Sequence, residues 1–323
     1  MRAIVYFKYG SPDVLELKEI DKPIVKDHDV LVRVRAASVN PYDWHFMTGL
    51  PYLGRLQFGL LKPKANGLGA DLSGQVEAVG KDVTRFRPGD EVYGEVATGA
   101  LAEYVCVPED GAVMKPTNLT FEQAAAVPMG ALTALQGLRD HGRIEQGQQV
   151  LINGASGGVG TFAIQIAKSF GAEVTGVCST RNEDLVRSIG ADRVFDYTRE
   201  DFTEAGQRYD LMLDNVGNRS LSECRRVLRP KGVYLSSFGQ PENLWLGPVA
   251  QLLKMMALSP FVSQNMRSFV ATPRQEDLLL MNELLEAGKV TPVIDRTYPL
   301  TEVAEAFRYL AEGHARGKVV ITV

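Results

Sequence analysis

The chain has 323 residues, a length that suits two domains of ordinary size better than one. Hydrophobic residues make up 45% and charged residues 23%, which is typical of a folded globular protein and excludes a largely disordered or fibrous chain. The formal net charge of −4 excludes the strongly basic surface of a nucleic-acid-binding protein.

The three cysteines, Cys106, Cys178 and Cys224, are far apart in the chain and odd in number. This spacing argues against both a disulfide framework and a zinc knuckle, and it fits a reducing compartment. The segment from Met1 to Phe7 predicts a β-strand rather than a signal peptide. No uninterrupted apolar stretch of membrane-spanning length occurs. We therefore expect a cytoplasmic protein without an integral membrane segment.

The first third of the chain predicts short β-strands. Val30 to Val39 alternates apolar and polar residues, and Gly74 to Gly80 is also strand-like. Between them, Gly49 to Gly69 is rich in Gly, Pro and Lys and has no clear period, so we expect a long loop. Arg87 to Asp90 is a turn that leads into another strand. Such closely spaced strands indicate a barrel-like or sandwich domain.

The pattern changes near Thr120, whose spacing to Gln123 predicts a capped helix. Strands are then expected over 149–153, 173–178, 193–195, 211–214 and 233–237, with helices over 161–169 and 182–189. Short apolar strands that alternate with helices predict a doubly wound parallel sheet. Helices over 274–287 and 301–312 follow, and the last strand, 319–323, should rejoin the first domain. We place the domains at 1–121 plus 272–323 and at 122–271.

The strongest motif is the glycine-rich segment from Asn153 to Gly160, NGASGGVG, which follows one predicted strand and begins a helix. Glycines allow a tight turn and a close approach of the backbone to a pyrophosphate, and the helix N-terminus supplies N–H groups and partial positive charge. A glycine string alone is weak evidence, but the strand–turn–helix context favours dinucleotide binding over a structural turn. The residues expected at the cofactor are Gly154, Ala155, Ser156, Gly157, Gly158 and Val159.

The segment after the next strand predicts which dinucleotide is bound. An NAD site usually offers an Asp or Glu there for the ribose hydroxyls. This chain instead has Ser179 and Arg181, and no acid before Glu183. Both side chains would donate to a 2′-phosphate, which an acid would repel. We therefore expect NADPH; the alternative is that Arg181 is only a solvated charge in a loop.

Further motifs extend along the whole chain in a fixed order. They are ASVNP (37–41), GADLSG (69–74), PGD (88–90), ALTA (131–134), the glycine-rich segment, GAD (190–192) and GKVV (317–320). With this set the chain resembles the quinone-oxidoreductase branch of the medium-chain dehydrogenase/reductase superfamily, especially chloroplast-envelope quinone oxidoreductase homologues and oxoene reductases. The resemblance implies an α/β fold in which a Rossmann domain is inserted into a β-rich GroES-like catalytic domain.

Zinc members of this superfamily carry a cysteine where Asn40 stands and a histidine where Ala70 stands, and neither replacement can serve as such a ligand. The four closely spaced cysteines of the structural zinc lobe are also missing. The resemblance therefore implies a zinc-free enzyme. Alcohol oxidation would lose its main electrostatic help without the metal. Hydride addition to an electron-poor acceptor needs less, so we expect reduction of a small lipophilic quinone or α,β-unsaturated carbonyl.

The resemblance also implies roles for residues of the first domain and the start of the second. Asn40 is expected beside the nicotinamide, and Thr133 is expected to contact it; the alternatives are a buried structural Asn and an ordinary helix Thr. His45, Tyr42 and Tyr52 are candidate proton donors. For His45 the alternative is an exposed loop histidine.

Residues at the carboxyl edge of the parallel sheet are expected at the cofactor as well. Asp71, which corresponds to an acidic residue behind the metal in zinc relatives, is expected to have only a structural role. Arg316 and Lys318 would approach the cofactor phosphates, unless they belong to a plain surface turn. The sheet-edge residues are Tyr197, Asn215, Val216, Ser237, Phe238 and Gly239.

Two alternatives to two-electron reduction stay open at this point. One is one-electron quinone reduction, which would release semiquinone radicals. The other is a non-catalytic NADPH-binding redox sensor or interaction module on the same fold, since both kinds of protein bind NADPH. The apolar segment from Leu244 to Val262 is equally open: it is either a Met-rich wall of the substrate cleft, or a surface helix or homodimer contact.

Overall fold

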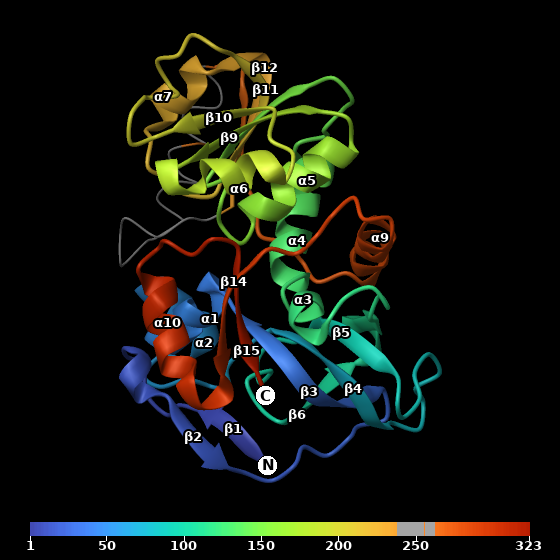
Figure 1. Cartoon of the computed structure of the whole chain (residues 1–323). Helices are drawn as coiled ribbons and strands as arrows, with labels where there is room; N and C mark the ends of the chain where they lie inside the picture. Colours follow the sequence, from blue (N-terminus) through green and yellow to red (C-terminus); the bar gives the residue numbers. More distant parts are fainter. Residues whose placement is uncertain (238–254, 256–261) are drawn as a thin grey trace. The chain divides into compact units, whose positions relative to one another are not determined.

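The computed structural model describes residues 1–237, Met255 and 262–323 (Figure 1). These residues form two compact units. The first, which we call the β-rich unit, comprises Met1–Leu132, Pro273–Gly288 and Pro292–Val323. The second, the parallel-sheet unit, comprises Thr133–Thr272 with Lys289–Thr291. The segment from Leu244 to Val262 lies almost wholly outside the described residues.

The β-rich unit is built on a mostly antiparallel sheet. Its strand order is β14 (Ile294–Pro299), β15 (Lys318–Thr322), β3 (Asp29–Val39), β4 (Asp71–Val79), β5 (Glu91–Glu95) and β7 (Ala112–Met114), and β6 (Tyr104–Pro108) also pairs with β3. A separate hairpin joins β1 (Arg2–Val5) to β2 (Glu16–Glu19). The last strand, β15, pairs antiparallel with β3. The prediction that the chain end rejoins the first domain is therefore confirmed.

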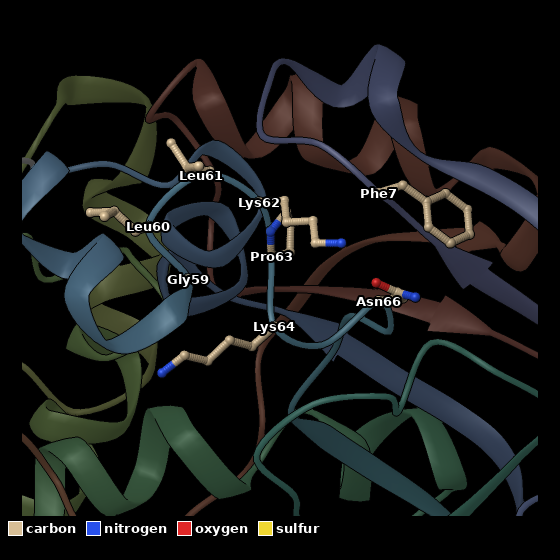
Figure 2. A pocket seen from close by; sticks show the side chains of 8 residues that line it. All are labelled: Phe7, Gly59, Leu60, Leu61, Lys62, Pro63, Lys64 and Asn66. Carbon is tan, nitrogen blue, oxygen red and sulfur yellow. The ribbon is translucent and has the colours of Figure 1, made fainter.

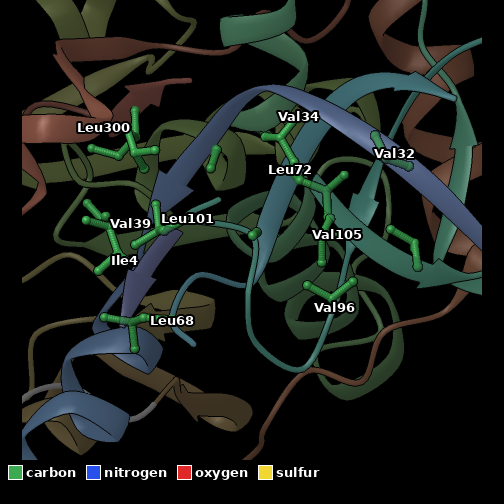
Figure 3. Close-up of a cluster of buried hydrophobic side chains, with 14 of the residues drawn as sticks. Ile4, Val32, Val34, Val39, Leu68, Leu72, Val96, Leu101, Val105 and Leu300 are labelled. Carbon is green, nitrogen blue, oxygen red and sulfur yellow. The ribbon is translucent and has the colours of Figure 1, made fainter. Parts of the chain in front are cut away.

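The core of this unit comes from the alternating strands. Val32 and Val34 of β3 point to the same side as Leu72 of β4, and all three are buried (Figure 3). Burial of such side chains stabilises a sheet because apolar area leaves water. The unit also holds α1 (Pro41–Thr48), α3 (Phe121–Ala125), α9 (Gln275–Glu286) and α10 (Val303–Ala311).

The parallel-sheet unit has the strand order β10 (Arg193–Asp196), β9 (Glu173–Cys178), β8 (Gln149–Asn153), β11 (Tyr209–Asp214), β12 (Leu228–Ser236) and β13 (Asn265–Ser268). All of these pairings are parallel. Strand order reverses between β8 and β11, and such a switch point is where open α/β sheets bind ligands. The fold is a Rossmann-like sheet, as predicted.

Helices pack against this sheet, two of them where the sequence predicted them. The helices α5 (Gly160–Ser169) and α6 (Glu183–Ser188) contact β8, β9 and β10, and α7 (Leu221–Arg226) contacts β12 (Figure 1). The strands β8 and β9 are almost continuously buried, which explains their apolar sequences. No helix among the described residues is both long and apolar enough to cross a membrane.

Several expectations need correction. The loop expected over 49–69 contains a 3₁₀ turn, Tyr52–Gly54, and the short helix α2 (Arg55–Phe58). The first unit extends to Leu132, inside α4 (Pro128–Gln136), rather than to residue 121, because α3 packs against β3 and β4 of the β-rich sheet. The strands β13 and β14 and the helix α7 were not predicted.

Candidate active-site elements of the two units

The glycine-rich segment turns the chain from β8 into α5. Gly154 has a φ of +79°, a left-handed conformation that favours glycine. A Cβ atom on Gly160 would lie 2.1 Å from the carbonyl oxygen of Gly154, so this position tolerates only glycine without a backbone shift. Ala155 is fully buried, and its N–H donates to Val177 of β9 at 3.0 Å. The segment therefore has the tight turn and close packing that a pyrophosphate cradle requires.

One amide joins this cradle to the loop after β9. The Nδ2 of Asn182 donates to Ser156 Oγ at 2.9 Å and lies 3.4 Å from Ser179 Oγ. Two residues predicted at the cofactor, Ser156 and Ser179, are thus brought together. Asn182 was not predicted from the sequence, because no local sequence pattern indicates which loops lie next to each other.

The end of β10 adds a cluster of hydroxyl groups beside the same loop. Asp196 pairs in register with Cys178 at the end of β9. Its carboxylate accepts hydrogen bonds from the hydroxyls of Thr180 and Thr198, and from the N–H of Thr198 at 2.9 Å. The next residue, Tyr197, is 46% exposed and therefore remains available to a ligand. An acid does lie near the β9 end, but its oxygens are occupied by neighbouring groups.

Asp214 organises the edge of the sheet at the end of β11. It is completely buried and accepts hydrogen bonds from Tyr234 Oη at 2.8 Å, Asn153 Nδ2 at 2.9 Å and the N–H of Gly217 at 2.9 Å. Burial of a carboxylate requires such partners. The loop that carries Val216 is consequently fixed close to the glycine-rich segment.

The other predicted residues of this edge lie where the strands end. Asn215 Nδ2 donates to the carbonyl of Asn153 at 3.2 Å, and Ser237 Oγ donates to Asn215 Oδ1 at 2.7 Å. Thr133 lies in α4 and is half-buried. Phe238 and Gly239 lie outside the described residues.

A buried polar cluster occupies the β-rich unit around Asn40, which caps α1. The side-chain Nδ2 of Asn40 donates to Asp71 Oδ2 at 3.0 Å, and its Oδ1 accepts a hydrogen bond from the ammonium of Lys318. Lys318 Nζ also lies 3.1 Å from Asp71 Oδ2. Asp71 further accepts from Ser38 Oγ at 2.7 Å. The amide of Asn40 is therefore oriented by an ion pair.

Lys318 differs from expectation. Lys318 is 3% exposed, and its ammonium donates hydrogen bonds to Asn40 and Asp71. The structure therefore corrects the expectation that Lys318 belongs to a surface turn or approaches the cofactor phosphates. The backbone of Lys318 directly follows the turn at Gly317, whose φ is +96°. Arg316 donates its N–H to Asp295 Oδ2 at 2.9 Å, and its phosphate contact stays a prediction.

Two more carboxyl groups face this cluster. Burial and repulsion by Asp71 raise the pKa of Asp43 to about 7, although the N–H groups of Asn40 and Gly69 donate to it. Burial and repulsion by Asp71 also raise the pKa of Glu95, to about 8, against the opposing effect of Lys318. Burial is the larger cause, and the charge balance adds to it, since three carboxyl groups share one ammonium.

The predicted proton donors follow Asn40 closely in the sequence, but His45 and Tyr42 already make hydrogen bonds to backbone carbonyls. His45 Nδ1 lies 2.8 Å from the carbonyl oxygen of Leu50, so Nδ1 must be the donor, and burial lowers the pKa of His45. Tyr42 Oη donates to the carbonyl of Ala97 at 3.2 Å, and burial raises its pKa to about 12. Tyr52 is 38% exposed. His45 is thus a half-buried neutral imidazole rather than an exposed loop histidine.

An open hollow of about 640 Å³ lies on the β-rich unit beside the segment after α2. Figure 2 shows Phe7 on one side and Leu60 and Leu61 on the other. Leu61 is 90% exposed and Leu60 is 65% exposed. This segment therefore presents two adjacent apolar side chains to solvent beside the hollow.

Among the described residues, no group of three or more His, Cys, Asp or Glu side chains is placed to hold a metal ion. Two family models match the chain: an alcohol dehydrogenase GroES-like domain over residues 26–117 and a zinc-binding dehydrogenase over 189–321. NAD(P)H oxidoreductase RTN4IP1, mitochondrial, of Mus musculus is 37% identical over 100% of this chain and 89% of its own length. The chain belongs to the medium-chain dehydrogenase/reductase superfamily.

Other members of the superfamily agree with this assignment. The chloroplastic NADPH-dependent alkenal/one oxidoreductase of Arabidopsis thaliana is 34% identical over 99% of this chain and 79% of its own length. The structure of the quinone oxidoreductase from Coxiella burnetii superposes with a TM-score of 0.88 at 31% identity, over 100% of this chain and 99% of that one. The resemblance seen in the sequence motifs is confirmed: the chain is an oxidoreductase of this superfamily with a GroES-like domain.

The first prediction concerns the glycine-rich turn. Gly160→Ala should lower the free energy of unfolding of the cofactor-free protein by about 1–3 kcal/mol, because its Cβ would collide with Gly154. Gly157→Ala is the matched control: its Cβ would lie 3.5 Å from the same oxygen, which is ordinary contact. Urea unfolding of both variants measures the difference. Equal stability of the two variants would show that the turn does not depend on Gly160.

Proposed function

We propose that this protein catalyses the NADPH-dependent reduction of quinones, or of the C=C bond of α,β-unsaturated carbonyls, without zinc. The observation that carries the proposal is the buried ammonium of Lys318 bonded to Asn40. Asn40 stands where zinc relatives carry a cysteine ligand, and Ala70 stands where they carry a histidine. A fixed positive charge at this place would repel a metal cation, and the remaining donors do not suit zinc. Zinc therefore does not fit these residues.

The cradle residues fit a dinucleotide. Gly154 and Gly160 allow the tight turn into α5, where a Cβ atom would collide with its neighbours, and the N-terminus of such a helix suits a pyrophosphate. Ser179 and Arg181 would hold a 2′-phosphate, and the acid at this edge, Asp196, already has hydroxyl and N–H partners. The name of the Arabidopsis relative, which states NADPH dependence, supports the same cofactor. When bound, NADPH supplies the hydride.

The acceptor that we propose is small and lipophilic. Without a metal, the site has no Lewis acid to stabilise an alkoxide, so an acceptor that is already electron-poor suits it better. The exposed leucines at the hollow, Leu60 and Leu61, support an apolar substrate. The names of the Arabidopsis and Coxiella relatives point to alkenals, enones and quinones. The homodimer and the cytoplasmic location stay predictions; the mouse and Arabidopsis relatives are named as mitochondrial and chloroplastic.

Cofactor choice gives the second prediction. Arg181→Glu should weaken NADPH binding by about 1.5–3 kcal/mol, the scale of a charge-assisted hydrogen bond, and should spare NADH. Arg187→Glu is the control, because Arg187 lies further along the chain in α6 and is paired with Glu183 at 3.6 Å. Fluorescence titration of each variant with both cofactors measures the effect. Equal weakening of NADPH and NADH by Arg181→Glu would refute the assignment of the 2′-phosphate to this residue.

Metal independence gives the third prediction and tests the proposal as a whole. The purified protein should oxidise NADPH in the presence of quinones or enones, contain no stoichiometric zinc, and keep its rate after dialysis against a chelator. Elemental analysis before and after dialysis, together with the rates, provides the measurement. One chelator-sensitive zinc per chain that is required for activity would contradict the zinc-free site. Absence of turnover with every acceptor would refute the proposed reaction.

A further inference from the structure

Reduction of an enone requires a proton as well as a hydride, and the three residues predicted as donors are poorly arranged to give one. His45 commits Nδ1 to Leu50, and its lowered pKa favours the neutral form, whose Nε2 can only accept. Tyr42 already donates to Ala97, and its raised pKa makes it a weak acid. The Arg55 guanidinium lies over the ring of Tyr52, 4.8 Å from its centroid.

Glu95 is differently placed. It is the last residue of β5 and lies directly opposite Asp71 in the antiparallel register of β4 and β5. The other charged and titratable groups that interact with it come from two further elements: Lys318 from β15, and Asp43 and Tyr42 from α1. Asp43, Asp71 and Lys318 are at most 3% exposed, whereas Glu95 is only partly buried.

This position gives Glu95 both a proton and a route to a bound molecule. Lys318 opposes the rise in the pKa of Glu95, but its ammonium is already paired with Asp71 at 3.1 Å. Burial and the charge of Asp71 then favour its protonated form near neutral pH. Glu95 is also only partly buried, and this partial exposure is what would let its carboxyl reach a substrate and regain a proton from solvent. A carboxylic acid that stays protonated near neutral pH is suited to general acid catalysis.

We propose that Glu95 is the acid that protonates the enolate when this protein reduces an α,β-unsaturated carbonyl, an inference that rests on the proposed function. Hydride addition at the β-carbon breaks the C=C π bond and leaves an enolate. The O–H bond of Glu95 then breaks, its proton forms the new C–H bond at the α-carbon, and the electron pair stays on the carboxylate. Water returns the proton. Lys318 and Asp71 remain paired and act as positioning residues.

Quinones provide an internal comparison, because water can protonate a reduced quinone without a protein acid. Glu95→Gln should therefore lower kcat for enones by about 100-fold or more, and leave kcat for quinones nearly unchanged. Glu95→Asp keeps a carboxyl and should recover part of the enone rate. Glu91→Gln is the matched control on the same strand: Glu91 is exposed and pairs with Lys115 at 3.1 Å, so both rates should persist.

The pH dependence supplies a second measurement. Because the protonated carboxyl is the active form, kcat for enones should fall as pH rises through the raised pKa of Glu95, and Glu95→Gln should abolish this dependence. Infrared difference titration of the cofactor-free protein should show a carboxyl that loses its proton well above the ordinary pKa of a glutamate. Glu95→Gln should remove the contribution of Glu95 to that signal, whereas the contribution of Asp43, whose pKa is raised to about 7, should remain.

The outcomes separate this inference from the proposed function. Equal losses on enones and quinones in Glu95→Gln, or no loss on enones, would overturn the role of Glu95 while leaving the reductase activity in place. Wild-type activity on quinones alone would also overturn it, since no enolate would then form. A wild-type protein that reduces neither acceptor would refute the proposed function itself, and an infrared titration that lacks the high-pKa carboxyl would independently refute the protonated state of Glu95.

Discussion

The polar interior of the β-rich unit depends on one ion pair, between the ammonium of Lys318 and the carboxylate of Asp71. Both groups are almost completely buried, so neither could stay charged there without the other. The pair also fixes the two ends of the Asn40 amide, because Lys318 donates to Oδ1 and Asp71 accepts from Nδ2. An interaction between β15, the last strand of the chain, and β4 therefore orients the residue at the predicted centre of the site.

The pair explains the neighbouring groups as well. One ammonium balances one carboxylate, and the two carboxyls that remain, Asp43 and Glu95, are pushed towards their protonated forms by burial and by Asp71. In zinc relatives a divalent cation would provide the positive charge of such a site. Here the Lys318 ammonium pairs with only one of the three carboxyl groups, so Asp43 and Glu95 can hold protons near neutral pH. The proposed zinc-free site and the proposed supply of protons for reduction would thus share one electrostatic origin.

The sequence predicted the parallel-sheet unit well because its signals are local. The strands β8 and β9 are buried on both faces and read as short apolar runs, and the turn from Gly154 to Gly160 must be glycine-rich wherever a strand turns into a helix so tightly. The strand β14 was missed because it is half exposed and has no alternation. Its place in the sheet is set by β15.

The buried cluster could be predicted only in part. Asn40 and Ala70 are visible in the sequence at positions where zinc relatives carry ligands, and they led to the expectation of a zinc-free site. The cation that compensates for them is not visible, because Lys318 lies 278 residues from Asn40, and only the pairing of β15 with β3 brings them together. Glu95 was missed for the same reason, since its position opposite Asp71 follows from strand register, which local patterns do not determine.

A double-mutant cycle on Lys318 and Asp71 tests the importance of this ion pair most directly. Unfolding free energies of Lys318→Met, Asp71→Asn and the double variant give the coupling energy, with the exposed pair of Lys22 and Glu77 at 2.9 Å as the reference. The account predicts that each single variant loses about 3–5 kcal/mol and that the double variant loses far less than their sum. The reference pair should show a coupling of about 1 kcal/mol or less. Additive losses at Lys318 and Asp71 would contradict the account.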